Sequence, residues 1–279
     1  MNYCQLNCFN NVGLVPLTNV DVNVMTAMKG HDSVVHFAAE SHVDRSIVGS
    51  EDFILTNCFG TNVIMDAARQ LEVSRVVHIG TDEVYGSVEV GSSKETDPLE
   101  PRSPYSASKA GSDMIVRSYF HTYGMSVVTT NCSNNYGPKQ HNEKLIPTII
   151  RKALAGENIP IYGDGKNVRD WLYVLDHCKG IELAFKKGKV GETYNIGGRN
   201  ERNNLYIVAV VCSILNELQP KTEGKYQDQI TFVKDRPGHD QRYAIDATKI
   251  ENELGWKANE NFESGIKKTI EWYLKKYAH

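Results

Sequence analysis

Residues 75–87 read RVVHIGTDEVYGS, a short run rich in valine that ends in a threonine and two adjacent acids, Asp82 and Glu83. A short, largely apolar and β-branched run is typical of a strand buried within a sheet. Neighbouring side chains of a strand point to opposite faces, so a strand cannot direct both acids at one target. If the strand ends at Thr81, the two acids lie on the turn beyond it and can address adjacent atoms of one ligand.

Predicted strands and helices alternate along the chain on both sides of this run. Apolar, β-branched runs predict strands at 33–39, 75–80, 125–134 and 190–198. Apolar residues at helical spacing predict helices at 53–71, 106–124, 143–156, 204–218 and 262–277. This alternation predicts an α/β fold built on a parallel sheet.

The composition argues against several classes of protein. The 279 residues carry a net charge of −3, which argues against a broad nucleic-acid-binding surface. No apolar run approaches the roughly 20 residues of a membrane span, and the N-terminus lacks the layout of a signal peptide. The cysteine spacing matches no metal site or disulfide framework, so we expect reduced thiols in a cytoplasmic protein and no bound metal. These cysteines are Cys4, Cys8, Cys58, Cys132, Cys178 and Cys212.

Tyr105 and Lys109 lie four residues apart at the start of a predicted helix and therefore share one face of it. A lysine in that position can lower the pKa of the tyrosine, which could then take a proton from a sugar hydroxyl. Taken alone, the pattern favours a solvated helix start. A second copy, Tyr162 with Lys166, lies in a glycine-rich loop where no helix can align the two side chains, and we interpret it as a decoy.

Three polar motifs lie where predicted strands end or where the helix between them begins. TDEVYG (81–86) closes one strand, PYSASKAG (104–111) opens the next helix, and NCSNNYGP (131–138) closes the following strand. Ligands of open parallel sheets bind at the carboxyl ends of the strands, so these motifs are expected to meet at one edge. A turn and helix cap remains the alternative for Asp82 and Glu83.

Eight motifs, in order and at compatible spacing, resemble those of dTDP-glucose 4,6-dehydratase, a family of the extended short-chain dehydrogenase/reductase group. Related sugar epimerases share the Tyr-x-x-x-Lys pattern but lack the Asp-Glu pair. Besides TDEVYG, PYSASKAG and NCSNNYGP, the motifs are HFAAESHVDRSI (36–47), EKLIP (143–147), RDWLYVLDH (169–177), GETYNIGG (191–198) and DRPGHDQRYAID (235–246).

The resemblance implies a doubly wound parallel Rossmann-type sheet, N-terminally truncated, with a smaller C-terminal substrate domain. It assigns residues 1–137 to a truncated NAD-binding Rossmann domain to which residues 167–197 return. Residues 138–166 and 198–279 then form the domain that binds the nucleotide sugar. It also implies a homodimer that pairs helices 53–71 and 106–124 as a four-helix bundle.

The resemblance also implies a reaction. Tyr105, beside Lys109, deprotonates the glucose 4-hydroxyl while C4 passes a hydride to NAD⁺. Glu83 then removes the proton from C5, Asp82 protonates the departing 6-hydroxyl, Thr81 bonds the 4-oxygen, and the hydride returns to C6. The acid must stay protonated while the base stays ionised, which requires two different pKa environments.

Further binding residues are implied in the same way. The NAD pocket would be lined by Phe37, Ala38, Ala39, Glu40, Ser41, Thr56, Tyr105, Lys109 and Asn135. The dTDP-glucose would be held by Thr81, Asn134, Lys144, Leu145, Pro160, Ile161, Tyr162, Arg169, Asn204, Asp235, Arg236, Pro237, Gly238 and His239. An anionic diphosphate favours the three basic residues of this set, although each alone could be a surface charge. We expect His42 and Asp44 to form a hydrogen-bonded pair in a loop.

The chain departs from the family at its start. The family's glycine-rich turn, which receives the NAD pyrophosphate at a helix N-terminus, has no counterpart, and residues 1–19 match nothing in the family. Asp21 and Val22 resemble residues that face the adenine. We expect a missing unit of roughly 50 to 60 residues, an exposed edge at strand 33–39, and weakened NAD⁺ binding. Gly80 replaces the usual serine.

Two other functions remain open at this point. The first is a catalytically silent remnant of the fold that binds a dTDP-sugar or only a partner subunit, which the missing glycine-rich turn favours. The second is an NAD-dependent nucleotide-sugar epimerase, against which Asp82 and Glu83 argue.

Overall fold

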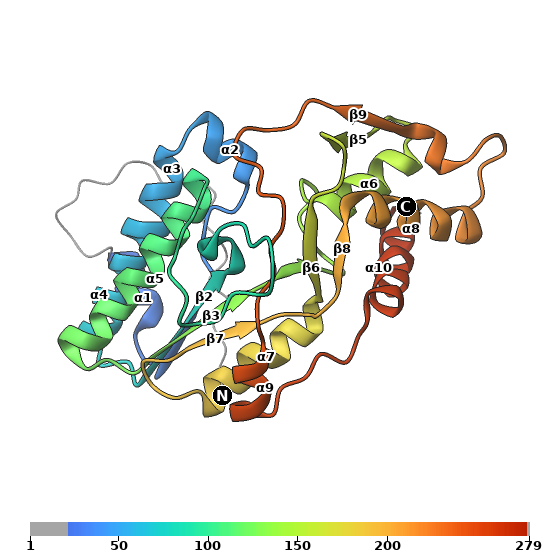
Figure 1. Cartoon of the computed structure of the whole chain (residues 1–279). Coiled ribbons are helices and arrows are strands. Elements are labelled where there is room, and N and C mark those ends of the chain that lie inside the picture. Colours follow the sequence, from blue (N-terminus) through green and yellow to red (C-terminus); the bar gives the residue numbers. More distant parts are fainter. Residues whose placement is uncertain (1–21, 278–279) are drawn as a thin grey trace.

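The structure, a computed structural model, describes residues 22–277 of the chain. Cys4, Cys8 and Asp21, which figure in the predictions above, lie outside the described residues. A sheet of four parallel strands in the order β1-β2-β3-β7 crosses the centre of the described part (Figure 1). These strands are β1 (Ser33–His36), β2 (Arg75–Thr81), β3 (Val127–Cys132) and β7 (Thr193–Ile196).

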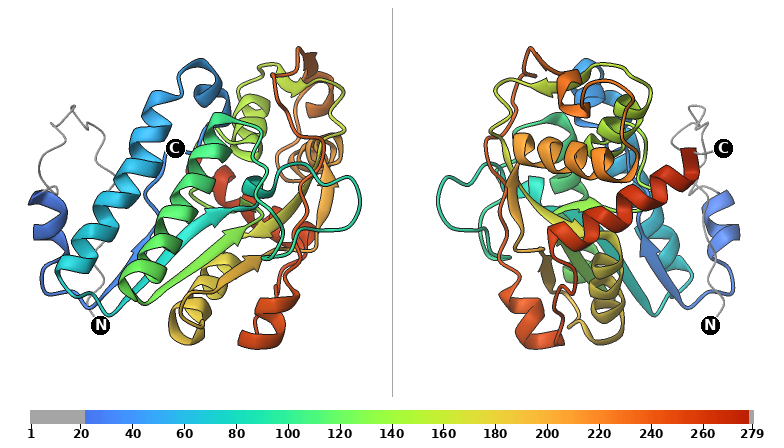
Figure 2. Two further views of the ribbon diagram at one scale, coloured as in Figure 1. Left: turned by 60° about the vertical axis from the view of Figure 1, so that its left-hand side comes forward. Right: turned by 90° about the vertical axis from the view of Figure 1, so that its right-hand side faces the viewer.

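Helices cover both faces of this sheet, so the predicted doubly wound arrangement is confirmed. On one face lie α1 (Val22–Met28), α4 (Gly60–Gln70) and α5 (Pro104–Tyr123), and on the other lie α7 (Val174–Lys187) and α9 (Thr248–Leu254) (Figure 2). Alternation along β2 sends Val76 into the core under α4 and α5 and Val77 into the core over α7 and α9.

Strand β1 lies at one edge of the sheet as the described residues define it, in the position predicted for it. It ends at His36, three residues before the predicted end. Val35, between the buried residues Val34 and His36, is 39% exposed.

Local sequence explains where α5 begins and ends. Ser103 and Ser106 form a capping box, Pro104 occupies the first turn, and Gly124 ends the helix in the left-handed conformation with φ of 66°. The predicted helix at 53–71 is not a single α-helix. It consists of α3 (Glu51–Phe53), a π-helical segment η1 (Ile54–Phe59) and α4.

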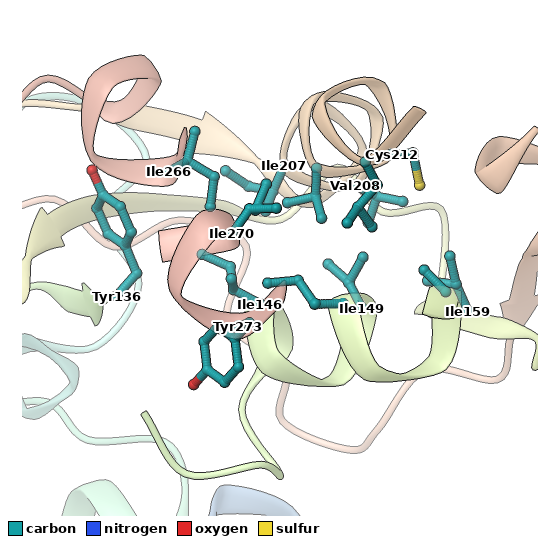
Figure 3. Close-up of a cluster of buried hydrophobic side chains, with 14 of the residues drawn as sticks. Tyr136, Ile146, Ile149, Ile159, Ile207, Val208, Cys212, Ile266, Ile270 and Tyr273 are labelled. Carbon is teal, nitrogen blue, oxygen red and sulfur yellow. The ribbon is translucent and has the colours of Figure 1, made fainter. Parts of the chain in front are cut away.

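A second hydrophobic core lies beside the sheet, where α6 (Leu145–Leu154), α8 (Asn204–Leu218) and α10 (Phe262–Tyr277) pack together (Figure 3). The bounds of α8 and α10 agree with the predicted ones. Ile149 of α6, Val208 of α8 and Ile270 of α10 are fully buried there. The pattern of apolar residues at helical spacing was sufficient to locate these helices because each buries one continuous face.

Short elements complete the described structure. Two small sheets have the strand orders β4-β6-β8 and β5-β9. Their strands are β4 (Asn134–Tyr136), β5 (Ile159–Tyr162), β6 (Val168–Tyr173), β8 (Glu201–Asn203) and β9 (Ile230–Val233). The remaining helices are α2 (Val43–Val48) and the 3₁₀-helices η2 (Asp82–Tyr85) and η3 (Tyr226–Gln229). Within residues 22–277, no helix is both long enough and apolar enough to cross a membrane.

Candidate active site

The tandem acids lie directly beyond the end of β2. The strand ends at Thr81 and η2 begins at Asp82, as the opening motif predicted. The Glu83 backbone N–H donates a hydrogen bond to Thr81 Oγ1 at 3.3 Å, so the threonine, rather than either acid, caps this short helix. Both carboxyl groups are therefore left for another role.

The carboxyl group of Asp82 lies in a dry, negative environment. The residue is 3% exposed, and its Oδ2 has no hydrogen-bond partner among the described residues. Burial, with the nearby charges of Glu83 and Asp170, raises the pKa of Asp82 well above its usual range, and Arg169 opposes that rise. A carboxyl group in this setting holds a proton and can donate it.

Glu83 lies in a more positive environment than its neighbour. Burial raises the pKa of Glu83, but the charges of Arg169, Arg236 and Lys144 act in the opposite direction. The three basic residues predicted to meet an anionic diphosphate thus converge around one of the two acids. The arrangement supplies the two different pKa environments that an acid and a base require.

Tyr105 and Lys109 lie one turn apart on α5, but the structure corrects the predicted pKa effect. Burial and the negative charge of Glu83 raise the pKa of Tyr105 well above its usual range. The Lys109 Nζ atom donates a hydrogen bond to the Ile79 carbonyl at 2.7 Å, and burial lowers the pKa of Lys109 itself. The net rise is opposite to the lowering expected from the spacing to Lys109, because desolvation of the phenolate and the charge of Glu83 dominate the pKa of Tyr105.

The second Tyr-x-x-x-Lys copy is not helical, as predicted, since Tyr162 ends β5 and Lys166 follows in a turn. The Tyr162 hydroxyl donates to Asp44 Oδ2 at 3.0 Å, and Arg236 Nη1 donates to Asp44 Oδ1 at 2.7 Å. The prediction of a His42–Asp44 pair is therefore wrong. His42 instead caps α2 by accepting a hydrogen bond from the backbone of the following turn.

Asn57, which the sequence analysis missed, holds the segment after β1 against α5. Its Oδ1 accepts from the Glu40 backbone N–H at 2.8 Å, and its Nδ2 donates to the Glu40 carbonyl at 3.0 Å and to Ser108 Oγ at 2.8 Å. Asn57 is buried inside the π-helical segment η1. An amide inside a predicted apolar helix was the signal that could have revealed it.

Residues predicted to line an NAD pocket come from the segment after β1 and from η1, α5 and β4. Lys144 Nζ donates to the Ser41 carbonyl at 2.5 Å, which ties the segment after β1 to the start of α6. Asn135 Oδ1 is buried and has no hydrogen-bond partner among the described residues. Phe37 is 59% exposed directly after β1. The same pocket is predicted to include Ala38, Ala39 and Thr56, of which Thr56 lies on η1 beside Asn57.

The residues predicted to hold the nucleotide sugar come from several separate segments of the chain. Asn134 and Asn204 each have a buried Oδ1 with no hydrogen-bond partner in residues 22–277. Leu145 begins α6, while Pro160 and Ile161 lie on β5. The Ile161 side chain is part of the second hydrophobic core, which leaves only its backbone to face a ligand.

The segment 235–239 folds back on itself beside Tyr162. His239 Nδ1 lies 2.7 Å from Asp235 Oδ1, and the His239 ring meets the Tyr162 ring edge-on at 6.4 Å between centroids. Gly238 has φ of 66°, a conformation that glycine adopts without strain, and Pro237 precedes it. Arg236 donates a hydrogen bond to Asp44, and its positive charge acts to lower the pKa of Glu83.

Two further acids shape the site, and the sequence analysis did not single them out. Asp170, on β6, accepts hydrogen bonds from the Gly198 and Asn200 backbone N–H groups at 2.7 and 2.6 Å. Asp240 is buried, and its charge raises the pKa of Glu83. Only the fold brings these acids near residues 82 and 83.

Comparisons with known proteins show which family the chain resembles. The family described as GDP-mannose 4,6 dehydratase matches residues 3–269, so the expectation that residues 1–19 match nothing does not hold for this family model. A dTDP-glucose 4,6-dehydratase from Xanthomonas campestris pv. campestris is 54% identical over 254 residues, covering 87% of this chain and 72% of the relative. A dTDP-glucose 4,6-dehydratase from Escherichia coli is 53% identical over 262 residues, with the same coverage.

Solved structures give the same result. DesIV, a dTDP-glucose 4,6-dehydratase from Streptomyces venezuelae solved with NAD and TYD bound, has a TM-score of 0.86 and 46% identity, covering 92% of this chain and 77% of that chain. The dTDP-glucose 4,6-dehydratase from Bacillus anthracis, solved with NAD, has a TM-score of 0.78 and 44% identity, covering 88% and 74%. On these likenesses, and on the site at the end of β2, the chain belongs to the dTDP-glucose 4,6-dehydratase family.

Proposed function

We propose that this protein converts dTDP-glucose to dTDP-4-keto-6-deoxyglucose with NAD as cofactor. The observation that carries the proposal is the pair of adjacent carboxyl groups in different electrostatic surroundings. Burial raises the pKa of both acids. The charges of Glu83 and Asp170 add to that rise at Asp82, whereas the charges of Arg169, Arg236 and Lys144 oppose it at Glu83. Removal of water across C5 and C6 needs one proton donor and one proton acceptor on neighbouring atoms, and this pair supplies both.

Each residue at this edge of the sheet takes one part of the reaction. Tyr105 accepts the proton of the 4-hydroxyl, with Thr81 as hydrogen-bond partner of the same oxygen. Once C4 is a ketone, Glu83 takes the acidified proton from C5. Asp82 gives its proton to the 6-hydroxyl, which leaves as water. NAD, when bound, supplies the reversible removal of hydrogen from C4 and its return at C6.

The pyrophosphate of the substrate is assigned to the basic residues Lys144, Arg169 and Arg236, which lie on three separate segments. The Arg169 guanidinium is held by the Val168 and Asp240 carbonyls at 2.7 and 2.9 Å, so its position is set before a ligand binds. We accordingly assign residues 1–137 and 167–197 to an NAD-binding domain, and residues 138–166 and 198–279 to a nucleotide-sugar-binding domain.

We further propose a homodimer built on η1, α4 and α5. Large apolar side chains on η1 and α5 are exposed in the single chain, which supports an interface with a second copy. They are Ile54, Leu55, Phe59, Met114 and Tyr123. A dimer by sedimentation at micromolar concentration that becomes a monomer in the double variant Ile54→Asp and Met114→Asp would support it. A monomeric wild type would exclude it.

Product analysis with dTDP-glucose and NAD⁺ tests the activity. A dTDP-4-keto-6-deoxy sugar is the expected product. UDP-glucose under the same conditions serves as the control that tests whether the reaction depends on the dTDP nucleotide. Formation of dTDP-galactose would instead identify an epimerase. Unchanged substrate together with measurable dTDP binding would identify a silent member of the family.

A further inference from the structure

Tyr105, Lys109 and Asp113 form a column along one face of α5, each separated from the next by four residues. The column runs from the phenol through the ammonium group to a carboxyl group. Lys109 is 4% exposed and Asp113 is 5% exposed. Tyr105 is the base of the proposed reaction, and the family motif contains both Tyr105 and Lys109. Asp113 has no role in either.

Asp113 is held in place by a histidine on the neighbouring strand. His78 Nε2 lies 3.1 Å from Asp113 Oδ1 and 3.2 Å from Ser112 Oγ, and His78 is fully buried on β2. His78 Nδ1 is also buried and has no hydrogen-bond partner among the described residues. The bond at Nε2 therefore selects the neutral tautomer that carries its proton there and donates it to the carboxylate.

The other groups that face Lys109 do not carry a stable negative charge. They are His36 on β1, His78 on β2, Cys58 on η1 and Cys132 on β3. Burial holds the pKa of both histidines well below their usual range, and raises the pKa of both thiols. In these surroundings Asp113 is the group that can balance the lysine charge.

A buried ammonium group without a counter-charge gives up its proton, because transfer of an ion into a low-dielectric interior costs more than deprotonation. Lys109 has one carbonyl acceptor, that of Ile79. We propose that Asp113, oriented by His78, is a positioning residue that keeps Lys109 protonated so that Lys109 can support the phenolate of Tyr105. The proposal rests on the proposed function only in naming Tyr105 as the base.

The titration of Asp113 supports this role. Burial raises the pKa of Asp113 to about 7, while Lys109 and the Asn131 side chain act to lower it. The carboxyl group thus becomes ionised near neutral pH, and its charge raises the pKa of Lys109 against the lowering effect of burial. The support that Lys109 gives to Tyr105 is expected to strengthen as the pH rises through 7.

A direct titration of Lys109 tests the proposal without relying on activity. Protein labelled with ¹³C at the lysine ε-carbons gives one signal per lysine, and the Lys109 signal is identified by its loss in Lys109→Met. In Asp113→Asn, which keeps an acceptor for His78 but removes the charge, the Lys109 midpoint should fall by about one pH unit or more. An unchanged midpoint would overturn the proposal.

Three further variants separate charge from structure. Asp113→Glu keeps the charge and should retain a midpoint near that of the wild type, while Ser112→Ala removes a contact to His78 without changing charge and should also retain it. If Asp113→Asn does not fold, His78→Gln should show a smaller fall in the same direction, because it loosens the carboxylate but does not remove it. A midpoint in His78→Gln identical to that of the wild type would then count against the proposal.

Kinetics provide a second measurement if the chain is active. Asp113→Asn should move the alkaline limb of the kcat profile to lower pH while the Kd for dTDP stays within about twofold. A uniform loss of kcat at every pH with an unchanged Lys109 midpoint would show a purely structural role. An inactive wild type with a shifted Lys109 midpoint would reject the proposed function and leave the electrostatic coupling intact.

Discussion

A Cβ atom added to Gly80 on β2 would overlap Oδ1 of Asn131, the residue paired with it on β3. Asn131 uses the space above the glycine to place its Nδ2 3.2 Å from the Tyr85 hydroxyl, to which it donates. Gly80, which stands where the family usually has serine, therefore leaves the space that the Asn131 side chain occupies.

This relationship predicts the effect of restoring the serine. Gly80→Ser should displace the Asn131 side chain and lower the free energy of unfolding by about 1–3 kcal/mol, the usual cost of an added group in a packed interior. Urea denaturation measures the loss. The double variant Gly80→Ser with Asn131→Ala should recover part of it relative to the sum of the single variants, and simple additivity would argue against the clash.

Glu83→Gln should stop the reaction after oxidation at C4. The amide cannot take the C5 proton, while Tyr105 can still deprotonate the 4-hydroxyl, so product formation should fall by about 10²–10⁴-fold. The measurements are product yield and exchange of the C5 hydrogen with deuterated water, both of which should be lost. Glu223→Gln, at an exposed position, is the matched control. Near-normal product formation would show that Glu83 is not the base.

Asp82→Asn should affect a later step. The variant lacks the proton for the departing 6-hydroxyl, so water loss should slow by about 10²-fold or more. Because Glu83 remains, exchange of the C5 hydrogen with solvent should continue faster than product appears. Identical exchange behaviour in the Asp82 and Glu83 variants would contradict the division of roles.

Arg236→Gln should weaken dTDP binding. A charge-assisted hydrogen bond contributes about 1.5–3 kcal/mol, which corresponds to a rise in Kd of roughly 10- to 100-fold. Titration calorimetry measures the Kd. Lys234→Gln removes an exposed positive charge two residues away and should have little effect. Equal losses in the two variants would indicate a general electrostatic effect rather than a direct contact.

His177, buried in α7, should make stability depend on pH in the acid range. Burial lowers the pKa of His177 to about 4, and its Nε2 has no partner in the described part of the chain. The folded-state pKa lies below the usual value of about 6.5, so the stabilisation is fully present above pH 6.5 and is lost as the pH falls toward 4. The difference in unfolding free energy between wild type and His177→Gln should change by about 2 kcal/mol between pH 7 and pH 5. The exposed His141→Gln should show no such change.

The sequence by itself determined the order of the elements and the location of the chemistry. Apolar spacing located helices 204–218 and 262–277 to the residue, because an amphipathic helix records its buried face in its own sequence. Residues 81–83, with the Tyr105 and Lys109 pair, marked the edge of the sheet at which the candidate site lies, because parallel strands bring their carboxyl ends together. The π-helical segment at 54–59 was not visible, because it depends on the contacts of the buried Asn57.

Tertiary structure alone decided the electrostatics. Asp82 and Glu83 are neighbours in the chain, yet Asp170 acts on the first and Arg236 on the second, and both come from segments far along the sequence. The net rise in the pKa of Tyr105 was not predicted for the same reason, since its burial is set by packing and not by the spacing to Lys109. A pKa depends on the distance to charges and on exclusion of water. Both are properties of the folded chain that local sequence does not encode.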